Sequence, residues 1–404
     1  MNEVKRIQGQ SLSRSTRLLF IIILGALGAF GPLSIDMYLP ALPTLAKELD
    51  TTTSLAQVSL TACLLGLAFG QVIMGPFSDI KGRKKPLIVA LLTYTGASIL
   101  CVFAPSIWIF IVLRFIQGVA GAAGMVISRA SIRDLFSGPD LTKFFSMLML
   151  VNGLAPIVAP VLGGQLLQVV SWRGVFGVLT VLGALMLLAV IVGLKETLPV
   201  EQRKTGGLKE VLSTFGILLK DRTFVGYALA QGFVMSAMFA YISGSTFVLQ
   251  DIYGLSPQMF SFVFAINGIG LILATQITGR LAGKIEEKDL LVYGLFQAVV
   301  SSLLLIVIIF INAPVAFVCV MLFFVVSSVG IVNTTVFSLA MQNQSANAGS
   351  ASALLGLLPF LLGATVAPLV GLGGGKTALP MGLVIAACAL IALGAYVVLI
   401  RRNK

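Results

Sequence analysis

The 404-residue sequence contains no histidine and little charge of either sign. Charged residues make up 10% of the chain and hydrophobic residues 58%, whereas soluble domains carry about 25% charged residues. The chain therefore has too few polar side chains to cover a water-exposed surface, and a lipid bilayer is the surrounding that suits it. Zinc and haem sites draw heavily on histidine and on clustered cysteine. We therefore expect no metal, no cofactor and no catalytic residues.

Cysteine and acidic residues are also scarce. The four cysteines lie in apolar stretches without paired spacing, which indicates small buried side chains and not disulfides. Fifteen acidic residues stand against 27 basic ones, so the net charge is +12. In a soluble protein this excess would suggest nucleic-acid binding. In a membrane protein it is the expected excess of Lys and Arg in cytoplasmic loops, so we expect lipid and no nucleic acid as a partner.

Long apolar runs are what the sequence has in abundance. Runs of about 20 residues are long enough to cross a bilayer as α-helices. The expected spans are 18–40, 55–76, 86–104, 107–128, 143–167, 172–193, 224–248, 258–281, 290–311, 314–336, 350–372 and 379–400. The sequence therefore predicts an all-α membrane protein with twelve transmembrane helices.

One polar stretch divides these spans six and six. It runs over 195–221 and predicts a cytoplasmic linker between an N-terminal six-helix bundle, 1–194, and a C-terminal bundle, 222–404. Residues 279–284 of the second half align with residues of the loop that follows the second span, as expected for two repeated halves with a site between them.

The basic residues predict the orientation. With the N-terminus inside, 23 of the 27 basic residues fall in cytoplasmic segments, three fall outside, and Arg114 lies within a span. In this count Arg129 and Arg133 belong to a cytoplasmic segment that follows the span 107–128. Because Lys and Arg favour the cytoplasmic side, this asymmetry predicts a multi-pass protein of the cell (plasma or inner) membrane with both termini in the cytoplasm.

The spans contain one acid, Asp36, and one base, Arg114. A charge inside a span costs about 2.5–3.5 kcal/mol on insertion scales and usually marks a transport pathway or a proton relay. Both residues are expected in the outer halves of their helices, where they could meet. We interpret them as a proton-coupling pair. The alternative is that Asp36 caps the outer end of the first helix, which Pro40 and Pro43 would terminate.

Several motifs resemble one family. The loop 75–86 reads GPFSDIKGRKKP and looks like the signature loop of the major facilitator superfamily. Residues 114–118 (RFIQG) and 159–164 (APVLGG) are similar to motifs of proton-coupled members and of drug antiporters. Residues 32–43 (PLSIDMYLPALP) resemble the first helix of the bicyclomycin-resistance (Bcr/CflA) branch. The resemblance covers the whole chain and implies the two-bundle major facilitator fold.

The resemblance also implies residue roles. Asp79 and Arg83, with Gly75 and Gly82, would form a latch that stabilises the outward-facing state. Arg114 would support proton exchange at Asp36. The fifth helix would form a hinge and a seal against proton leak through Gly153, Pro156, Pro160, Gly163 and Gly164, for which ordinary small-residue packing is the alternative.

A few polar residues within spans are candidates for a substrate cavity. They are Tyr38, Asn152, Tyr241, Asn267 and Asn333, and each could instead serve packing alone. The expected function is export of small amphipathic compounds or drugs by proton antiport, by a monomer working through alternating access. The alternative is a metabolite or nutrient transporter of the same fold. A membrane enzyme or sensor is disfavoured because the chain has no soluble domain or cluster of reactive side chains.

Overall fold

The computed structural model describes residues 14–136, 138–203, 208–342, 344, 348–373 and 377–401. The first half contains α2 (Arg14–Asp36), η1 (Leu39–Ala41), α3 (Leu42–Glu48), α4 (Thr53–Lys81), α5 (Lys84–Val102), α6 (Ile107–Leu135), α7 (Gly138–Leu166) and α8 (Trp172–Gly193). Between the halves lie η2 (Val200–Gln202) and α9 (Leu208–Leu218). The second half contains α10 (Arg222–Phe247), η3 (Val248–Ile252), α11 (Pro257–Leu281), α12 (Glu287–Phe310), α13 (Val315–Met341), α14 (Ala348–Val366), η5 (Ala367–Gly373) and α15 (Leu379–Leu399).

Twelve of these helices are long and apolar, as predicted. Eleven have the length and hydropathy required to cross a membrane, and the twelfth, α7, has 29 residues with an apolar portion at Gly153–Leu166. A helix rises 1.5 Å per residue and the hydrocarbon core is about 30 Å thick, so about 20 residues suffice. The helices therefore have the length that a bilayer demands.

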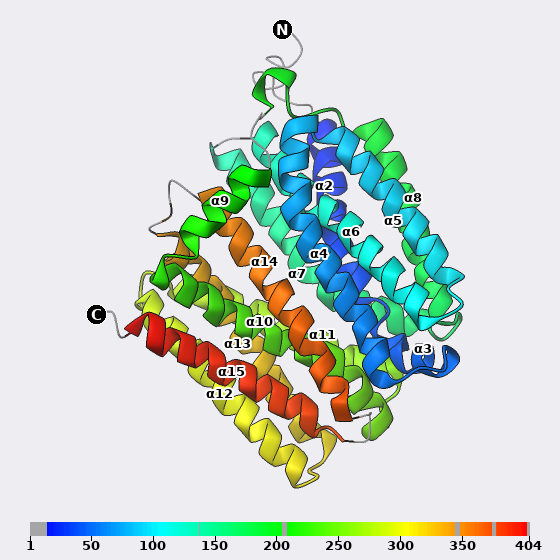
Figure 1. Cartoon of the computed structure of the whole chain (residues 1–404), viewed down its shortest axis with the longest axis vertical. Helices are drawn as coiled ribbons and strands as arrows, with labels where there is room; N and C mark the ends of the chain where they lie inside the picture. Colours follow the sequence, from blue (N-terminus) through cyan, green and yellow to red (C-terminus); the bar gives the residue numbers. More distant parts are fainter. Residues whose placement is uncertain are drawn as a thin grey trace.

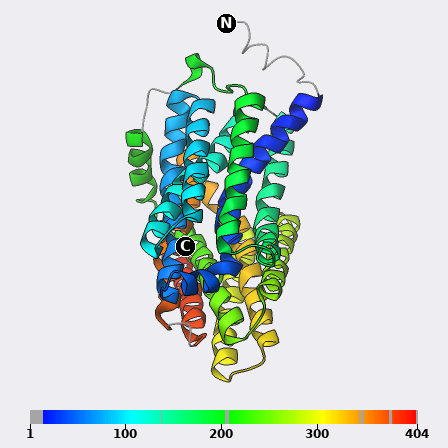
Figure 2. The ribbon, with the colours of Figure 1, turned by 90° about the vertical axis from the view of Figure 1, so that its right-hand side faces the viewer.

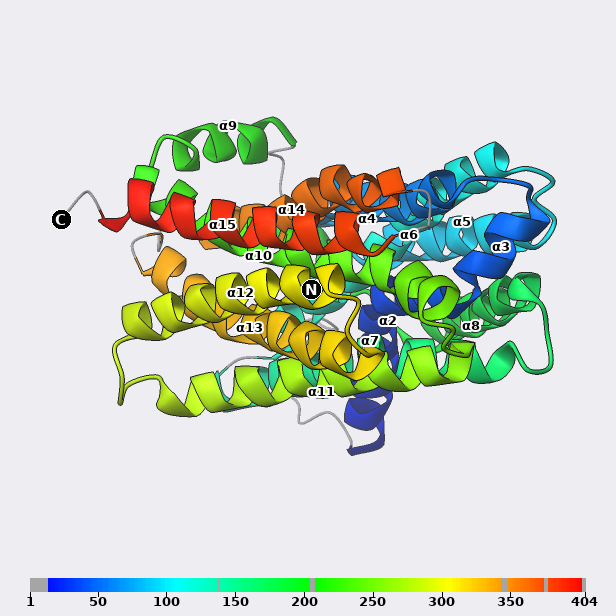
Figure 3. The same cartoon turned by 90° about the horizontal axis from the view of Figure 1, so that it is seen from below.

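The twelve helices form two bundles of six (Figure 1). In the first, α4 packs on α6, α5 packs on α6 and α8, and α2 packs on α6 and α7. In the second, α10 packs on α13, α14 and α15, while α12 and α13 lie side by side with α11 against α13 (Figure 3). Glycine brings α4 and α6 together, because a Cβ on Gly66 or Gly118 would collide with the backbone of the other helix. Such close approach through small residues is typical of membrane helices.

The two bundles meet mainly through two helix pairs, α4 with α14 and α7 with α11. In Figure 1 the bundles converge toward the end that carries α3 and diverge toward the end that carries α9. We call the first the distal end. The second, which holds the loop after α4 and the linker, is called the basic end. Helix α9 contacts both α4 and α14 there, so it touches both bundles.

The ends of two helices differ from the sequence prediction. Helix α2 stops at Asp36, and η1 and the short α3 follow, with α3 lying across the long helices (Figure 2). Pro40 and Pro43 therefore do not terminate the first long helix; each stands in the first turn of a new helix, where proline is tolerated. Helix α6 continues to Leu135, beyond the expected end of the span at residue 128, so Arg129 and Arg133 are helical residues.

Candidate functional site

Asp36 is the last residue of α2 and lies between the bundles. Its side chain is 4% exposed, and its Oδ1 atom has no hydrogen-bond partner. The segment η1, which follows it, packs on α10 and α11 of the other bundle. The capping interpretation has no hydrogen bond to support it, since a helix ends in carbonyl acceptors and a carboxylate is itself an acceptor. Asp36 is thus a buried acid at the boundary between the halves.

Arg114 is completely buried in α6, and neutral groups hold its charge. Its Nη2 atom donates to the carbonyl oxygen of Ser34 at 2.7 Å, and Nη1 donates to Oε1 of Gln117. Its guanidinium carbon lies 4.3 Å from the centre of the Tyr38 ring, a cation–π distance. Among the described residues no ion pair joins Arg114 to Asp36. The expected direct pair is therefore not formed in this conformation.

Arg114 instead reaches Asp36 through the backbone of α2. The bonded carbonyl belongs to Ser34, two residues before Asp36, and the Ser34 hydroxyl shares a 2.7 Å hydrogen bond with Tyr94 of α5. Gln117 extends the network by donating to Ser98 of α5 at 2.7 Å. Arg114 therefore fixes the position of the end of α2, and with it the acid.

The candidate cavity residues separate into different environments. Tyr241 and Asn267 belong together, because Asn267 Nδ2 donates to the Tyr241 hydroxyl at 2.9 Å and both are 1% exposed. Tyr38 is 0% exposed beneath Arg114, so it packs in the first bundle and does not line an open cavity. Asn333 donates to the sulfur of Met235 at 3.1 Å. The side chain of Asn152 lies outside the described residues.

The loop after α4 is organised around Arg83. Its guanidinium donates to Asp79 at 2.5 Å and to Asp134 of α6 at 2.8 Å. Burial alone would lower the pKa of Arg83, but the hydrogen bonds and charges of Asp134 and Asp79 outweigh it and raise that pKa. The expected contact between Asp79 and Arg83 is present, and it lies within the first bundle.

Two acids that sequence reasoning missed complete this loop. Asp134 bonds Arg83, and Glu196 accepts the backbone N–H groups of Arg83 at 2.8 Å and Lys84 at 3.2 Å. Glu196 lies beside Gly82, whose φ of +88° and lack of space for a Cβ both call for glycine. Gly75 has room for a Cβ, which would meet Val126 only at 3.7 Å. The run of basic residues marks this loop in the sequence. The two acids that bind it lie far along the chain, so the sequence did not show which acids they are.

The fifth transmembrane helix, α7, contains Pro156 and Pro160 in its interior. Three of its glycines face different neighbours. A Cβ on Gly163 would overlap the carbonyl oxygen of Met37, and one on Gly164 would press on Ser261 and on the Pro257 carbonyl of α11. A Cβ on Gly153 would meet Ile272 at an ordinary 3.7 Å. Close packing therefore requires glycine at 163 and 164 and not at 153.

The profile of the Major Facilitator Superfamily matches residues 18–368. The chain belongs to this superfamily. It is 46% identical over 377 residues to the uncharacterized MFS-type transporter YdgK of Bacillus subtilis (strain 168), covering 93% of this chain and 94% of that protein. It is 31% identical over 390 residues to a bicyclomycin resistance protein homolog of Haemophilus influenzae, covering 96% and 98% of the two chains. The family expected from the motifs is thus confirmed, and the protein is a multi-pass membrane transporter of small molecules.

Solved structures show the same fold. A bacterial homolog of the human lysosomal transporter Spinster, inward-facing and unoccupied, superposes with a TM-score of 0.71 at 14% identity, covering 95% of this chain and 96% of that one. A D-xylose-proton symporter gives 0.71 at 16% identity, with 94% and 97% covered. The predicted fold of two six-helix bundles is therefore confirmed.

The distal end of this major facilitator protein is sealed by neutral hydrogen bonds between the bundles. Gln57 donates to the carbonyl oxygen of Ser243 at 3.1 Å, and Ser54 donates to that of Gly371 at 2.8 Å. Two further glutamines make similar bonds, Gln250 to Pro40 at 3.3 Å and Gln258 to Gly164 at 3.0 Å. All four bonds join a side chain of one bundle to the backbone of the other.

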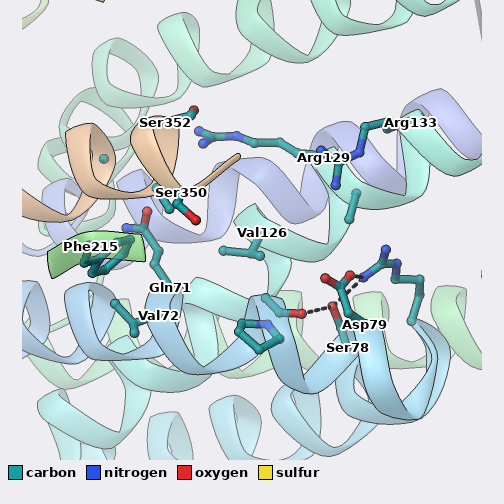
Figure 4. Close-up of a pocket in the computed structure, with 16 residues that line it drawn as sticks. Gln71, Val72, Ser78, Asp79, Val126, Arg129, Arg133, Phe215, Ser350 and Ser352 are labelled. Atoms are coloured by element: carbon teal, nitrogen blue, oxygen red, sulfur yellow. Dashed lines mark hydrogen bonds and ion pairs between the residues drawn. The ribbon is translucent and has the colours of Figure 1, made fainter. Parts of the chain in front are cut away.

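The basic end of the transporter is hollow. A pocket of about 390 Å³ lies between α4 and α6 of one bundle, α14 of the other and α9 of the linker (Figure 4). The latch residues Asp79 and Arg83 line its wall, and Gln71 lies deeper along α4. A sealed distal end and an open basic end define one of the two access states of an alternating-access carrier.

Proposed function

We propose that this protein exports small amphipathic compounds in exchange for protons. The observation that carries the proposal is Asp36, a buried carboxyl without an ion-pair partner among the described residues. An unpaired charge in such a place is costly, so a proton that neutralises it lowers the free energy. Asp36 adjoins η1, which packs on α10 and α11 of the other bundle, so movement of the bundles would change its surroundings and the ease with which it holds that proton.

Relatives support the export direction. A bicyclomycin resistance protein homolog, a chloramphenicol resistance protein of Pseudomonas aeruginosa and multidrug resistance proteins MdtL are among the similar proteins. Arg114 would act as a positioning residue, since its bond to the Ser34 carbonyl holds the end of α2. The proposed cycle alternates the basic-end pocket with an opening at the distal end.

The orientation and boundaries complete the proposal. The basic end would face the cytoplasm of a cell (plasma or inner) membrane, as the excess of Lys and Arg requires, with both termini inside. The functional unit would be a monomer of two bundles, 1–194 and 222–404, joined by a linker over 195–221. Accessibility of single cysteines introduced into the loops, probed with a membrane-impermeant reagent, tests the orientation.

The Asp36→Asn variant tests proton coupling. In proteoliposomes with an imposed proton gradient, Asp36→Asn should abolish gradient-driven transport while exchange of substrate without a gradient persists. Asp36→Glu should retain part of the coupled transport. Asp251→Asn is the matched control, because Asp251 is an exposed acid of the distal end. Equal proton-driven transport by Asp36→Asn and wild type would refute the role of Asp36.

A growth assay identifies the direction and the substrate range. Overproduction in an efflux-deficient host should raise tolerance to at least one compound of a broad toxic panel, and Asp36→Asn should remove that gain. No shift in tolerance across the panel would favour the alternative of a metabolite or nutrient transporter.

A further inference from the structure

The basic-end pocket contains a charge pattern that proton coupling does not use. Arg129 and Arg133 of α6 project into it, and Ser350 and Ser352 of α14 lie opposite them. Figure 4 shows Arg129 extending toward Ser352 across the space between the bundles. Because the two arginines are four residues apart on one helix, they share a face. The pocket therefore has two guanidinium groups in its lining.

The charges in this pocket do not balance. Asp79 and Arg83 also line it, but Arg83 is bonded to Asp79 at 2.5 Å and to Asp134 at 2.8 Å. Arg129 and Arg133 make no hydrogen bond and no ion pair with any described residue, and both side chains are exposed to the pocket. With Asp134 counted, three arginines thus stand against two carboxylates, and neither Arg129 nor Arg133 has an ion-pair partner among the described residues.

Membrane orientation alone does not account for this placement. Arg129 lies six residues before the end of α6 at Leu135, about 9 Å along the helix axis. It faces the other bundle across the pocket (Figure 4) and does not project from the end of the helix. Charges that only orient a helix are equally effective in an exposed loop.

The lining has the chemistry of an amphipathic anion site. Guanidinium groups bind carboxylate, sulfonate and phosphate oxygens through paired N–H donors, and serine hydroxyls add further donors. Val72, Val126 and Phe215 give the same pocket an apolar wall that suits a hydrophobic body. We propose that this pocket binds the acidic group of the substrate, so that the compounds carried are amphipathic anions or zwitterions. This inference rests on the proposed export function and names its substrate class.

Matched fluorescent probes test the charge preference directly. Dansylglycine carries a carboxylate and dansylcadaverine an ammonium on the same fluorophore. Titrated into the purified full-length protein in detergent, dansylglycine should bind wild type more tightly than dansylcadaverine does. Arg129→Gln/Arg133→Gln should weaken dansylglycine binding about tenfold or more, since it removes two charge-assisted contacts. Binding of dansylcadaverine should be unchanged or tighter.

The control removes the same charge elsewhere at the basic end. Arg280→Gln/Lys284→Gln changes two exposed cations outside the pocket and should leave both affinities unchanged. Arg129→Lys/Arg133→Lys keeps the charge and should retain most of the dansylglycine affinity, which decides the matter if the Gln variant does not fold. Raising NaCl from about 50 to about 500 mM should weaken only the anionic probe, by screening.

Two outcomes overturn the proposal. One is equal dansylglycine affinity in wild type and the folded Arg129→Gln/Arg133→Gln variant. The other is tighter binding of dansylcadaverine than of dansylglycine to wild type. Neither involves a proton gradient, so the test is independent of proton coupling. The arginine variants could weaken dansylglycine binding as expected while Asp36→Asn still transports with the gradient. In that case only proton coupling through Asp36 would be refuted.

Discussion

Gly164 sits at the contact between the bundles, and a single methyl group there should shift the transporter between its access states. The ideal Cβ of Gly164→Ala lies 3.1 Å from the Pro257 carbonyl oxygen and 3.2 Å from Cβ of Ser261, both on α11. These atoms belong to the bundle opposite Gly164, so opening of the distal end would separate them from it. Overpacking of this kind costs about 1–3 kcal/mol. The distal-open state should therefore gain by a factor of about 5–150.

Distance measurements between spin labels can follow this shift. Lys47 of the first bundle and Asp251 of the second are exposed at the distal end and flank the same pocket. Labels on cysteines at these positions report the separation of the bundles by pulsed electron resonance. Gly164→Ala should increase the population with the longer distance.

Two other glycines of α7 are the controls. Gly153→Ala also faces α11, but its Cβ would lie at an ordinary 3.7 Å from Ile272, so the distances should not change. Gly163→Ala collides with Met37 of its own bundle, so it should lower the unfolding temperature without favouring the open state. The reasoning is refuted if Gly164→Ala lowers the unfolding temperature as Gly163→Ala does and leaves the distances unchanged.

Two further changes test the latch and the seal. Arg83→Ala removes a cation that is bonded to both Asp79 and Asp134 and should destabilise the protein by about 2–3 kcal/mol, since both carboxylates keep some contact with water. Thermal unfolding in detergent measures this loss, and Arg83→Lys should recover part of it. An unchanged unfolding midpoint would contradict the prediction. Gln57→Leu removes a neutral bond worth about 1 kcal/mol, so the long-distance population should rise equally at low and high salt; a salt-dependent rise would be inconsistent with a neutral seal.

The fold could be predicted from the sequence because a bilayer leaves few choices. Apolar length fixes the number of spans, and the alternation of basic loops checks it. Hydropathy does not show where a helix ends beyond the hydrocarbon, however. Helix α6 continues past the apolar run to Leu135, so the apolar run alone does not show that Arg129 and Arg133 are helical.

The sequence identified several residues of the site but not the contacts that they make. Asp36 is buried, as its position within a span suggested. Its pairing with Arg114 was not found, because the guanidinium bonds the Ser34 carbonyl and lies on the Tyr38 ring. Such side-chain directions depend on packing among three helices, and no pattern along one helix encodes them. Asp134 was missed for the same reason.

Binding of an anionic substrate in the basic-end pocket would have an electrical consequence for the transport cycle. If one proton enters through Asp36 for each monoanion that leaves, both movements carry charge in the same direction, equivalent to two positive charges moving inward. Each elementary charge crossing the membrane is worth about 2.3 kcal/mol per 100 mV, so the two charges together would gain about 4.6 kcal/mol for each 100 mV of membrane potential. A membrane potential, negative inside, would then drive export even where the proton concentrations on the two sides are equal.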